Sequence, residues 1–297
     1  MIDVAQCSTM QNQLLAVLSA KVQERISVHL ERVFLHCGDV LHESGQPLHH
    51  IYFPADGIVS LICETREGGA AEVAIVGNEG LVGVELFMGG RTTTNRAIVR
   101  SECCVYRLPT DRLMAEFNCH GELMVQVLRY AQSLMTQMAQ NAVCNRHHSI
   151  TQRLCRRLIG SLDLCDDNRV DMTQELIANM LGVRRESITE VALKLQSVGA
   201  IAYRRGQIRV LNRAQLETSS CECYSVVRKE TLRLQPYLTR TAVIGSTRSA
   251  NALLFTRAAT NWAPSASSSK KPLRSIGSSK QPASLKGRGV TSAVLVN

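Results

Sequence analysis

The chain has 297 residues, is 45% hydrophobic and carries a formal net charge of +9. This length fits two domains, and no apolar run reaches the roughly 18 residues that a membrane-spanning helix needs. The N-terminus lacks the basic start and apolar stretch of a secretory signal, so we expect a cytoplasmic protein whose 11 cysteines are reduced.

The charge is unevenly divided along the chain. Residues 1–143 contain 10 basic and 15 acidic side chains, whereas residues 144–213 contain 12 and 7. Residues 240–297 contain nine basic side chains and no acidic one. This distribution indicates that the acidic first part does not meet a polyanion and that the basic second part does.

Short strands dominate the first part. Residues 9–30 have apolar side chains at helical spacing and predict one or two short helices. Between residues 31 and 108, eight short runs alternate with glycine-rich turns, which is typical of a jelly roll or small barrel. Because glycine and β-branched residues are frequent, we expect no helix in this stretch.

A long helix is predicted next, over residues 121–145, after a short one at 111–117. One of its apolar stripes can cover the β-roll and contains Leu123, Val127, Tyr130 and Leu134. We expect the other stripe, at heptad spacing, to pair two copies in parallel; the alternative is a single helix packed on its own domain. That dimerisation stripe contains Met124, Leu128, Ala131, Met135, Met138 and Ala142.

Residues 174–193, which follow a predicted helix at 149–164, have the pattern of a helix-turn-helix. Ala178 is small enough for two short helices to cross closely, and Gly182 accepts the positive φ of the turn. Thr173 is a good N-cap for the first helix. The shared core is expected to contain Ile177, Leu181, Val183, Ile188 and Val191.

The second helix of this motif exposes basic and hydrogen-bonding side chains, which suits insertion into the major groove of duplex DNA. Arginine bonds guanine O6 and N7, and glutamate accepts from cytosine N4. A hairpin over residues 200–211, with a basic turn at 204–207, predicts a wing that contacts phosphates. The expected DNA-binding residues are Thr173, Arg184, Arg185, Glu186, Ser187, Thr189, Glu190, Lys194, Arg204 and Arg205.

A β-roll, a long helix and a winged helix-turn-helix in this order resemble the Crp/Fnr family of bacterial transcription regulators. The resemblance covers residues 14–211 and is carried by MTQELIANMLGVRRESITEVALKLQSVGAI with its wing, and by GDVLHESG and IYFPADGIVSL in the roll. It implies a homodimer that binds a near-palindromic operator under the control of a β-roll sensor, with RNA polymerase as a further partner. The family's base-reading Arg-Glu pair matches Arg185-Glu186, whereas Arg184 replaces a frequent serine cap and Glu190 replaces a second arginine.

The family resemblance leaves the effector open. Cyclic-nucleotide members hold the ligand with Gly-Glu-Leu and Arg-Ser/Thr; the comparable residues here are Gly83, Glu85, Asn95 and Arg96. Glu85 is offset by one position, and Ala97 stands where a hydroxyl is expected. The iron–sulfur cluster of oxygen-sensing members is not expected, nor does any residue argue specifically for haem, so we predict no cofactor and a small-molecule effector of unknown identity.

The cysteines do not form paired CxxC motifs, so we expect no metal site. The pair Cys221-Glu222-Cys223 favours a structural role near a helix start, with a thiol sensor or a metal site as the alternatives.

Two other classes of function compete with the regulator. A cupin-like metal enzyme would draw on His36, His42, Glu43, His49 and His50, but the HxH spacing of that scaffold is missing. A cyclic-nucleotide-binding signalling module would share the roll without binding DNA. We expect a protein that is not an enzyme.

The predicted fold is of the α+β class. It divides into a β-roll sensor domain (9–120), a dimerisation helix (121–148), a winged helix-turn-helix domain (149–235) and a disordered basic tail (240–297), whose composition buries too little apolar surface to fold.

Overall fold

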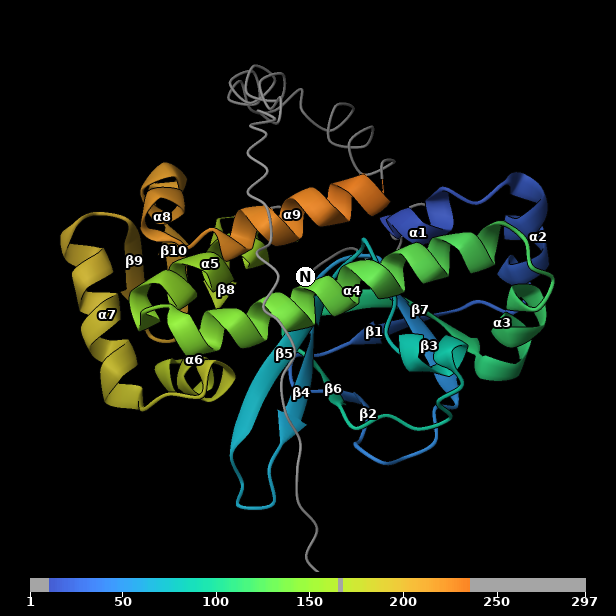
Figure 1. Ribbon diagram of the computed structural model, residues 1–297, viewed down its shortest axis with the longest axis horizontal. Coiled ribbons are helices and arrows are strands. Elements are labelled where there is room, and N and C mark those ends of the chain that lie inside the picture. The colour runs from blue at the N-terminus through green and yellow to red at the C-terminus, as the bar shows by residue number, and fades with distance from the viewer. Residues whose placement is uncertain (1–10, 165–167, 236–297) are drawn as a thin grey trace, which may run out of the picture. The chain divides into compact units, whose positions relative to one another are not determined.

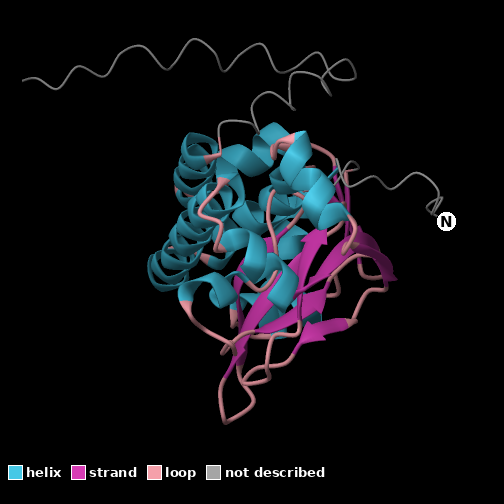
Figure 2. Ribbon diagram, turned by 90° about the vertical axis from the view of Figure 1, so that its right-hand side faces the viewer, coloured by secondary structure: helices cyan, strands magenta, loops and turns pink. Residues whose placement is uncertain are grey.

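The computed structural model describes residues 11–164 and 168–235 (Figure 1). The predicted tail at 240–297 lies outside these residues. Strands dominate the first part of the described chain, and helices with one small sheet make up the second. Figure 2 shows the strands gathered on one side of the molecule and most helices on the other. The predicted α+β class, with an N-terminal β-roll, a long helix and a C-terminal helix-turn-helix, is confirmed.

The β-roll consists of two antiparallel sheets preceded by two short helices, α1 (Gln13–Ala16) and α2 (Ala20–Ser27). The first sheet has the order β1 (Glu31–Leu35), β7 (Cys103–Pro109), β3 (His50–Pro54). The second has the order β2 (Val40–His42), β6 (Arg96–Val99), β4 (Val59–Glu64), β5 (Ala70–Val76). Inward-facing side chains of both sheets form one core, which includes Ile51, Phe53, Val59, Val76 and Leu108.

The expectation of no helix in the roll is wrong at one place. One of the eight runs predicted as strands covers residues 80–86, but Val84–Met88 forms the 3-10 helix η3. Gly83 and Gly89 flank it with φ values of 101° and 90°, which only glycine adopts readily. These two turns direct the backbone out of the extended conformation. The strand propensity of the residues between them does not prevent this, because that propensity depends on packing against a paired strand.

The long helix α4 (Glu122–His147) follows α3 (Thr110–Phe117) and lies against the roll. Its predicted roll-facing stripe is confirmed, since Leu123, Val127, Tyr130 and Leu134 are all buried in the core of the roll. Two amide side chains of α4 also bond the backbone of β5. The Gln137 Oε1 atom accepts from the Ile75 N–H at 2.6 Å, and the Asn141 Nδ2 atom donates to the Val73 carbonyl at 2.6 Å.

The C-terminal part has its own core. Its elements are α5 (Ile150–Leu162), β8 (Arg169–Asp171), α6 (Gln174–Leu181), α7 (Arg185–Ser197), β9 (Ile201–Arg204), β10 (Gln207–Val210), α8 (Arg213–Ser219) and α9 (Cys223–Leu234). The strands form an antiparallel sheet in the order β8-β10-β9. A capping box between Ser149 and Gln152 starts α5 immediately after α4 ends. The α5 helix then buries Leu154 and Leu158 in this core.

The last helix, α9, packs antiparallel along α4. Its first residue, Cys223, accepts from Gln140 Nε2 at 3.1 Å, and the hydroxyl of Thr231 lies 2.8 Å from that of Ser133. Since residue numbers fall along α4 as they rise along α9, the two helices run in opposite directions. The α9 helix thus covers a second face of α4, beside the one that packs on the roll.

A buried ion pair joins the helical part to the roll. Arg157 Nε of α5 lies 2.6 Å from Glu72 Oε1 of β5, and both side chains are only 6% exposed. The Ser60 hydroxyl donates to the second carboxylate oxygen of Glu72 at 2.5 Å. The strand β5 therefore contacts both α4 and α5.

Within residues 11–164 and 168–235, no helix has the length and apolar character needed to cross a membrane.

Candidate nucleic-acid interface

The turn between α6 and α7 has the geometry that the sequence predicts. Thr173 caps α6, because its hydroxyl accepts from the Leu176 N–H at 3.2 Å. The helix ends at Gly182, whose φ of 61° and ψ of 43° are left-handed. The next N–H, of Val183, donates to the Ala178 carbonyl at 2.9 Å, which closes the turn.

The two helices share the predicted core. Ile177, Ala178, Leu181 and Ile188 are buried, and Val183 and Val191 are partly buried against the same cluster. The side chain of Arg153 on α5 donates to the Leu181 carbonyl at the end of α6. Since α6 and α7 pack on one core and α5 bonds the end of α6, contacts within the chain set the angle between the two helices.

The first turn of α7 presents free basic side chains. Arg184 is the N-cap residue, Arg185 and Glu186 open the helix, and all three are exposed. Among the described residues, no ion pair engages either arginine. Glu190 and Lys194 are exposed further along α7, and Ser187 is half-buried.

Thr189 has an internal partner. Its hydroxyl donates to the Gln174 side-chain oxygen at 2.8 Å, which links α7 to the first turn of α6. Thr189, one of the ten predicted DNA-binding residues, therefore helps to position α7 against α6. Its hydroxyl is less available to a base than the side chains of Arg185 and Glu186.

The wing is tighter than the sequence predicts. Arg204 pairs with Gln207, so Arg205 and Gly206 form a two-residue loop instead of the expected four-residue turn. Both have positive φ, 51° and 80°, which is the type I′ geometry that matches the twist of a hairpin. Arg204 and Arg205 are exposed, so the wing tip carries two adjacent positive charges.

The predicted effector residues separate into two places. Glu85 on η3 accepts from Thr93 Oγ1 at 3.0 Å and from Asn95 Nδ2 at 3.2 Å. Arg96 instead pairs with Glu43 at 2.9 Å and with Glu64 at 3.5 Å. An anion would have to displace these two carboxylates from Arg96. Packing accounts for the glycine at position 83, because a Cβ there would lie only 2.6 Å from Ile51 Cδ1.

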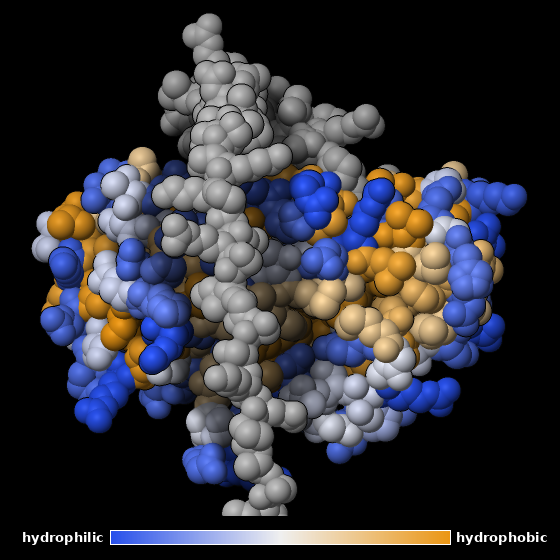
Figure 3. Space-filling model, viewed as in Figure 1, coloured by the Kyte–Doolittle hydropathy of each residue, from blue (hydrophilic) through white to orange (hydrophobic). Residues whose placement is uncertain are grey.

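The predicted dimerisation stripe is only partly exposed. Leu128 and Met135 are 46% and 48% exposed, and Ala142 is also exposed. Met124 and Met138 are half-buried, while Ala131 is buried in the chain's own core. Val125 and Val143, which the prediction left out, are exposed on this side of α4. Figure 3 shows apolar surface on the side of the molecule where α4 faces the viewer.

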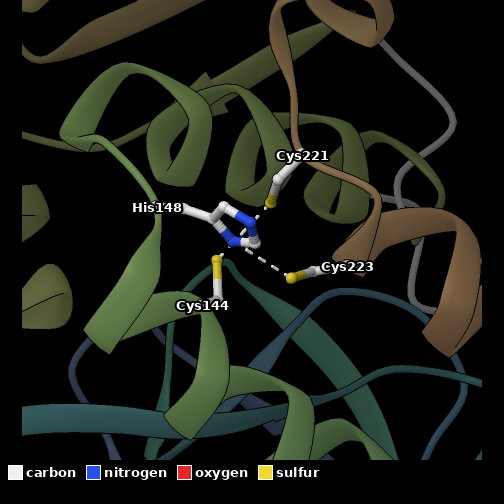
Figure 4. Close-up of side chains that lie close together, drawn as sticks. All are labelled: Cys144, His148, Cys221 and Cys223. Atoms are coloured by element: carbon white, nitrogen blue, oxygen red, sulfur yellow. Dashed lines mark hydrogen bonds between the residues drawn. The ribbon is translucent and has the colours of Figure 1, made fainter.

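A cluster of metal-ligand side chains lies where α4 ends, and it was not predicted from the sequence (Figure 4). It comprises Cys144, His148, Cys221 and Cys223, whose ligand atoms all lie within 4.8 Å of one another. Burial raises the pKa of the Cys144 thiol and raises that of Cys221 to about 12. The signal in the sequence was the spacing Cys144-x3-His148, which places both side chains on one face of a helix.

The histidines proposed for a cupin-like enzyme do not form such a group. In the described part of the chain, His36, His42, His49 and His50 do not gather with Glu43 around a common point. Burial lowers the pKa of the His42 imidazole.

A family model described as a cyclic nucleotide-binding domain matches residues 32–118, and one described as a Crp-like helix-turn-helix domain matches residues 152–219. No curated protein matches the chain.

Solved structures share the fold at low sequence identity. FixK2 from Bradyrhizobium japonicum has a TM-score of 0.57 at 14% identity, covering 65% of this chain and 98% of its own. The c-di-GMP responsive global regulator CLP from Xanthomonas campestris has a TM-score of 0.54 at 19% identity, with coverage of 65% and 99%. A Crp/Fnr-family transcriptional regulator from Thermus thermophilus has a TM-score of 0.53 at 20% identity, with coverage of 64% and 98%.

Proposed function

Since the chain belongs to the Crp/Fnr family of DNA-binding transcription regulators, we propose that two copies together bind a near-palindromic operator. The observation that carries this proposal is the exposed Arg185-Glu186 pair at the start of α7. The packing of α6 against α7 positions this pair on the surface before DNA binds, which favours contact with base edges.

The division of labour between helix and wing follows from chemistry. Arg185 has the bidentate donors that match guanine O6 and N7, and Glu186 accepts from cytosine N4. The two wing arginines carry charge without a fixed base partner, so they contact phosphates on either side of the groove. Thr173, Arg184, Ser187, Glu190 and Lys194 complete the proposed DNA-binding surface.

The proposed dimer uses the exposed side of α4. Apolar side chains recur there at heptad spacing, and pairing them with a second copy removes them from water. A two-fold axis between the paired helices would present two α7 helices to successive major grooves about 34 Å apart. We propose the stripe Val125, Leu128, Met135 and Ala142, in place of the one that includes the buried Ala131.

We propose a separate role for each of three segments of the chain. Residues 9–120 act as the sensor domain, 121–148 as the dimerisation helix and 149–235 as the DNA-binding domain. A small molecule bound by the roll, at Gly83, Glu85, Asn95 and Arg96 or beside them, biases the presentation of α7 through α4. RNA polymerase is the further partner, and the cytoplasm is the proposed location.

The test is selection of DNA fragments from a random pool by the full chain at about 150 mM salt, near physiological ionic strength. We expect an enriched sequence with two inverted half-sites whose centres are one helical turn apart. Binding that enriches no sequence would contradict the proposal. Enrichment of a sequence without inverted repeats would support sequence-specific DNA recognition but would contradict the proposed dimer.

A further inference from the structure

We propose that Cys144, His148, Cys221 and Cys223 bind one zinc ion. The four side chains come from the last turns of α4 and from the start of α9, far apart in the sequence, and they converge on one point (Figure 4). Nothing in the proposed DNA-binding function requires them.

The distances fit a tetrahedral ion. Zn–S and Zn–N bonds of about 2.3 and 2.0–2.1 Å give tetrahedral edges of about 3.8 Å between two sulfurs and about 3.6 Å between sulfur and nitrogen. The Cys144 and Cys221 sulfurs lie 3.5 Å apart. The Cys223 sulfur lies 3.3 Å from His148 Nδ1. Small outward shifts of these four atoms would therefore make room for the ion.

The imidazole is already oriented as a ligand. Nδ1 of His148 faces the thiols, while Nε2 lies 3.3 Å from the Glu222 carboxylate. Metal-bound histidines usually donate their other N–H to a carboxylate or carbonyl, which fixes the ring and its tautomer. Gln140 adds a second support, because its Nε2 donates to the Cys223 sulfur at 3.1 Å.

The donor set selects the class of metal. Three thiolates and one imidazole favour zinc over magnesium or calcium, which take oxygen ligands. The three cysteines are buried and the His148 side chain is only 13% exposed, so no open position faces solvent. A closed set of four protein ligands is typical of a structural zinc site. Binding would release the three thiol protons to solvent.

Packing of small apolar thiols explains part of the cluster, since free cysteines are often buried. It does not explain why an imidazole nitrogen points at them. A disulfide would use two sulfurs and leave the third cysteine and His148 without a role. Zinc binding accounts for all four side chains together.

The site lies at the junction between α4 and α5, so a bound ion would affect how these two helices are joined. His148 is the C-cap of α4, and the next residue, Ser149, is the N-cap of α5. A bound ion would tie this joint to the start of α9, and so fix the angle at which the DNA-binding domain leaves α4. We expect zinc to raise the melting temperature and to slow exchange of backbone amides around the joint.

The experiment uses the full chain, purified without oxygen in the presence of a reductant and then stripped of metal with a chelator. Added Co²⁺ should bind at one equivalent per chain, with the visible bands of tetrahedral cobalt and sulfur-to-cobalt charge-transfer bands. Zn²⁺ should displace it. This titration needs no substitution, so it does not depend on the folding of a variant.

Matched variants locate the ligands. Cys221→Ser and His148→Gln should lose the cobalt spectrum or weaken it strongly, whereas Cys119→Ser, which changes an exposed cysteine, should leave it intact. Glu222→Gln keeps all four ligands and should weaken zinc binding about 10- to 100-fold.

Two results would overturn the inference. One is a reduced, folded chain, with its thiols confirmed as free, that binds neither Co²⁺ nor Zn²⁺. The other is a cobalt spectrum that survives Cys221→Ser and His148→Gln unchanged.

Discussion

Arg185 and Arg205 are both exposed, yet their backbones give them different roles. Arg185 stands in the first turn of a helix whose packing fixes the position of its backbone. Arg205 stands at φ 51° in a two-residue loop at the end of a hairpin. The first arrangement suits recognition of one base pair, and the second suits a contact with the backbone of any sequence.

The change Arg185→Ala should weaken operator binding by about 1–3 kcal/mol and relax the preference at one base position. Its physical cause is the loss of a bidentate pair of hydrogen bonds. Titration of labelled operators that differ at single positions measures both effects. Arg66→Ala, at an exposed arginine in the roll, is the control and should leave affinity unchanged. Equal losses on operator and random DNA would refute base reading by Arg185.

The change Arg205→Ala should weaken binding to operator and random DNA alike and reduce the slope of log affinity against log salt by about 1. A lost phosphate contact releases one counterion fewer. Arg205→Asn is a matched variant, because asparagine tolerates the positive φ of the loop, and it should behave in the same way. A loss confined to the operator would show that the wing reads sequence.

Residues within one local motif were predictable from the sequence, and residues brought together by the tertiary fold were not. Ala178, Gly182 and Thr173 lie within ten positions, so spacing determines their relation. Cys144 and Cys221 are 77 positions apart, and their contact depends on how α9 packs on α4. The partners of Arg96 were equally unpredictable, because Glu43 follows β2 and Glu64 ends β4, the strands on either side of β6.

The helix α4 has three faces with different partners. One packs on the roll through Leu123 and Leu134, and a second meets α9 through Ser133. The third is exposed and apolar around Leu128 and Met135. Helical periodicity predicted the element and its roll-facing stripe. It could not predict that Ala131 is buried within the chain, because a helix pattern contains no information about a covering element elsewhere in the sequence.

The double change Leu128→Glu and Met135→Glu should convert the proposed dimer to a monomer and abolish tight operator binding. Four carboxylates would face one another across the paired helices. Light scattering and sedimentation measure the mass. The control, Val28→Glu with Met88→Glu, makes the same chemical change at exposed apolar residues outside α4 and should leave the dimer intact. A dimeric double variant would rule out this face.

At the scale of the molecule, β5 joins the roll to the helical part of the described chain. Its backbone bonds the side chains of Gln137 and Asn141 on α4, and its Glu72 pairs with Arg157 on α5. A charge pair this deeply buried costs much desolvation, and its loss is costly when only one partner is removed. We therefore expect this contact to couple the unfolding of the roll to that of the helical part.

Glu72→Gln and Arg157→Met should each lower the free energy of unfolding by about 3–5 kcal/mol, because each leaves one buried polar partner unmatched. The double variant should lose less than the sum of the two. Urea unfolding of all four proteins measures this coupling. Additive losses would mean that the pair contributes little beyond its separate side chains.

The two amide side chains of α4 stand where another strand would otherwise add to β5. Gln137 accepts from the Ile75 N–H and Asn141 donates to the Val73 carbonyl, so the outer edge of the sheet is sealed by side chains instead of backbone. A signal that shifted α4 along the roll would break these two hydrogen bonds and expose the backbone of β5 to water. The Ile75 amide proton is thus a natural reporter, whose exchange with deuterium would register each displacement of the helix.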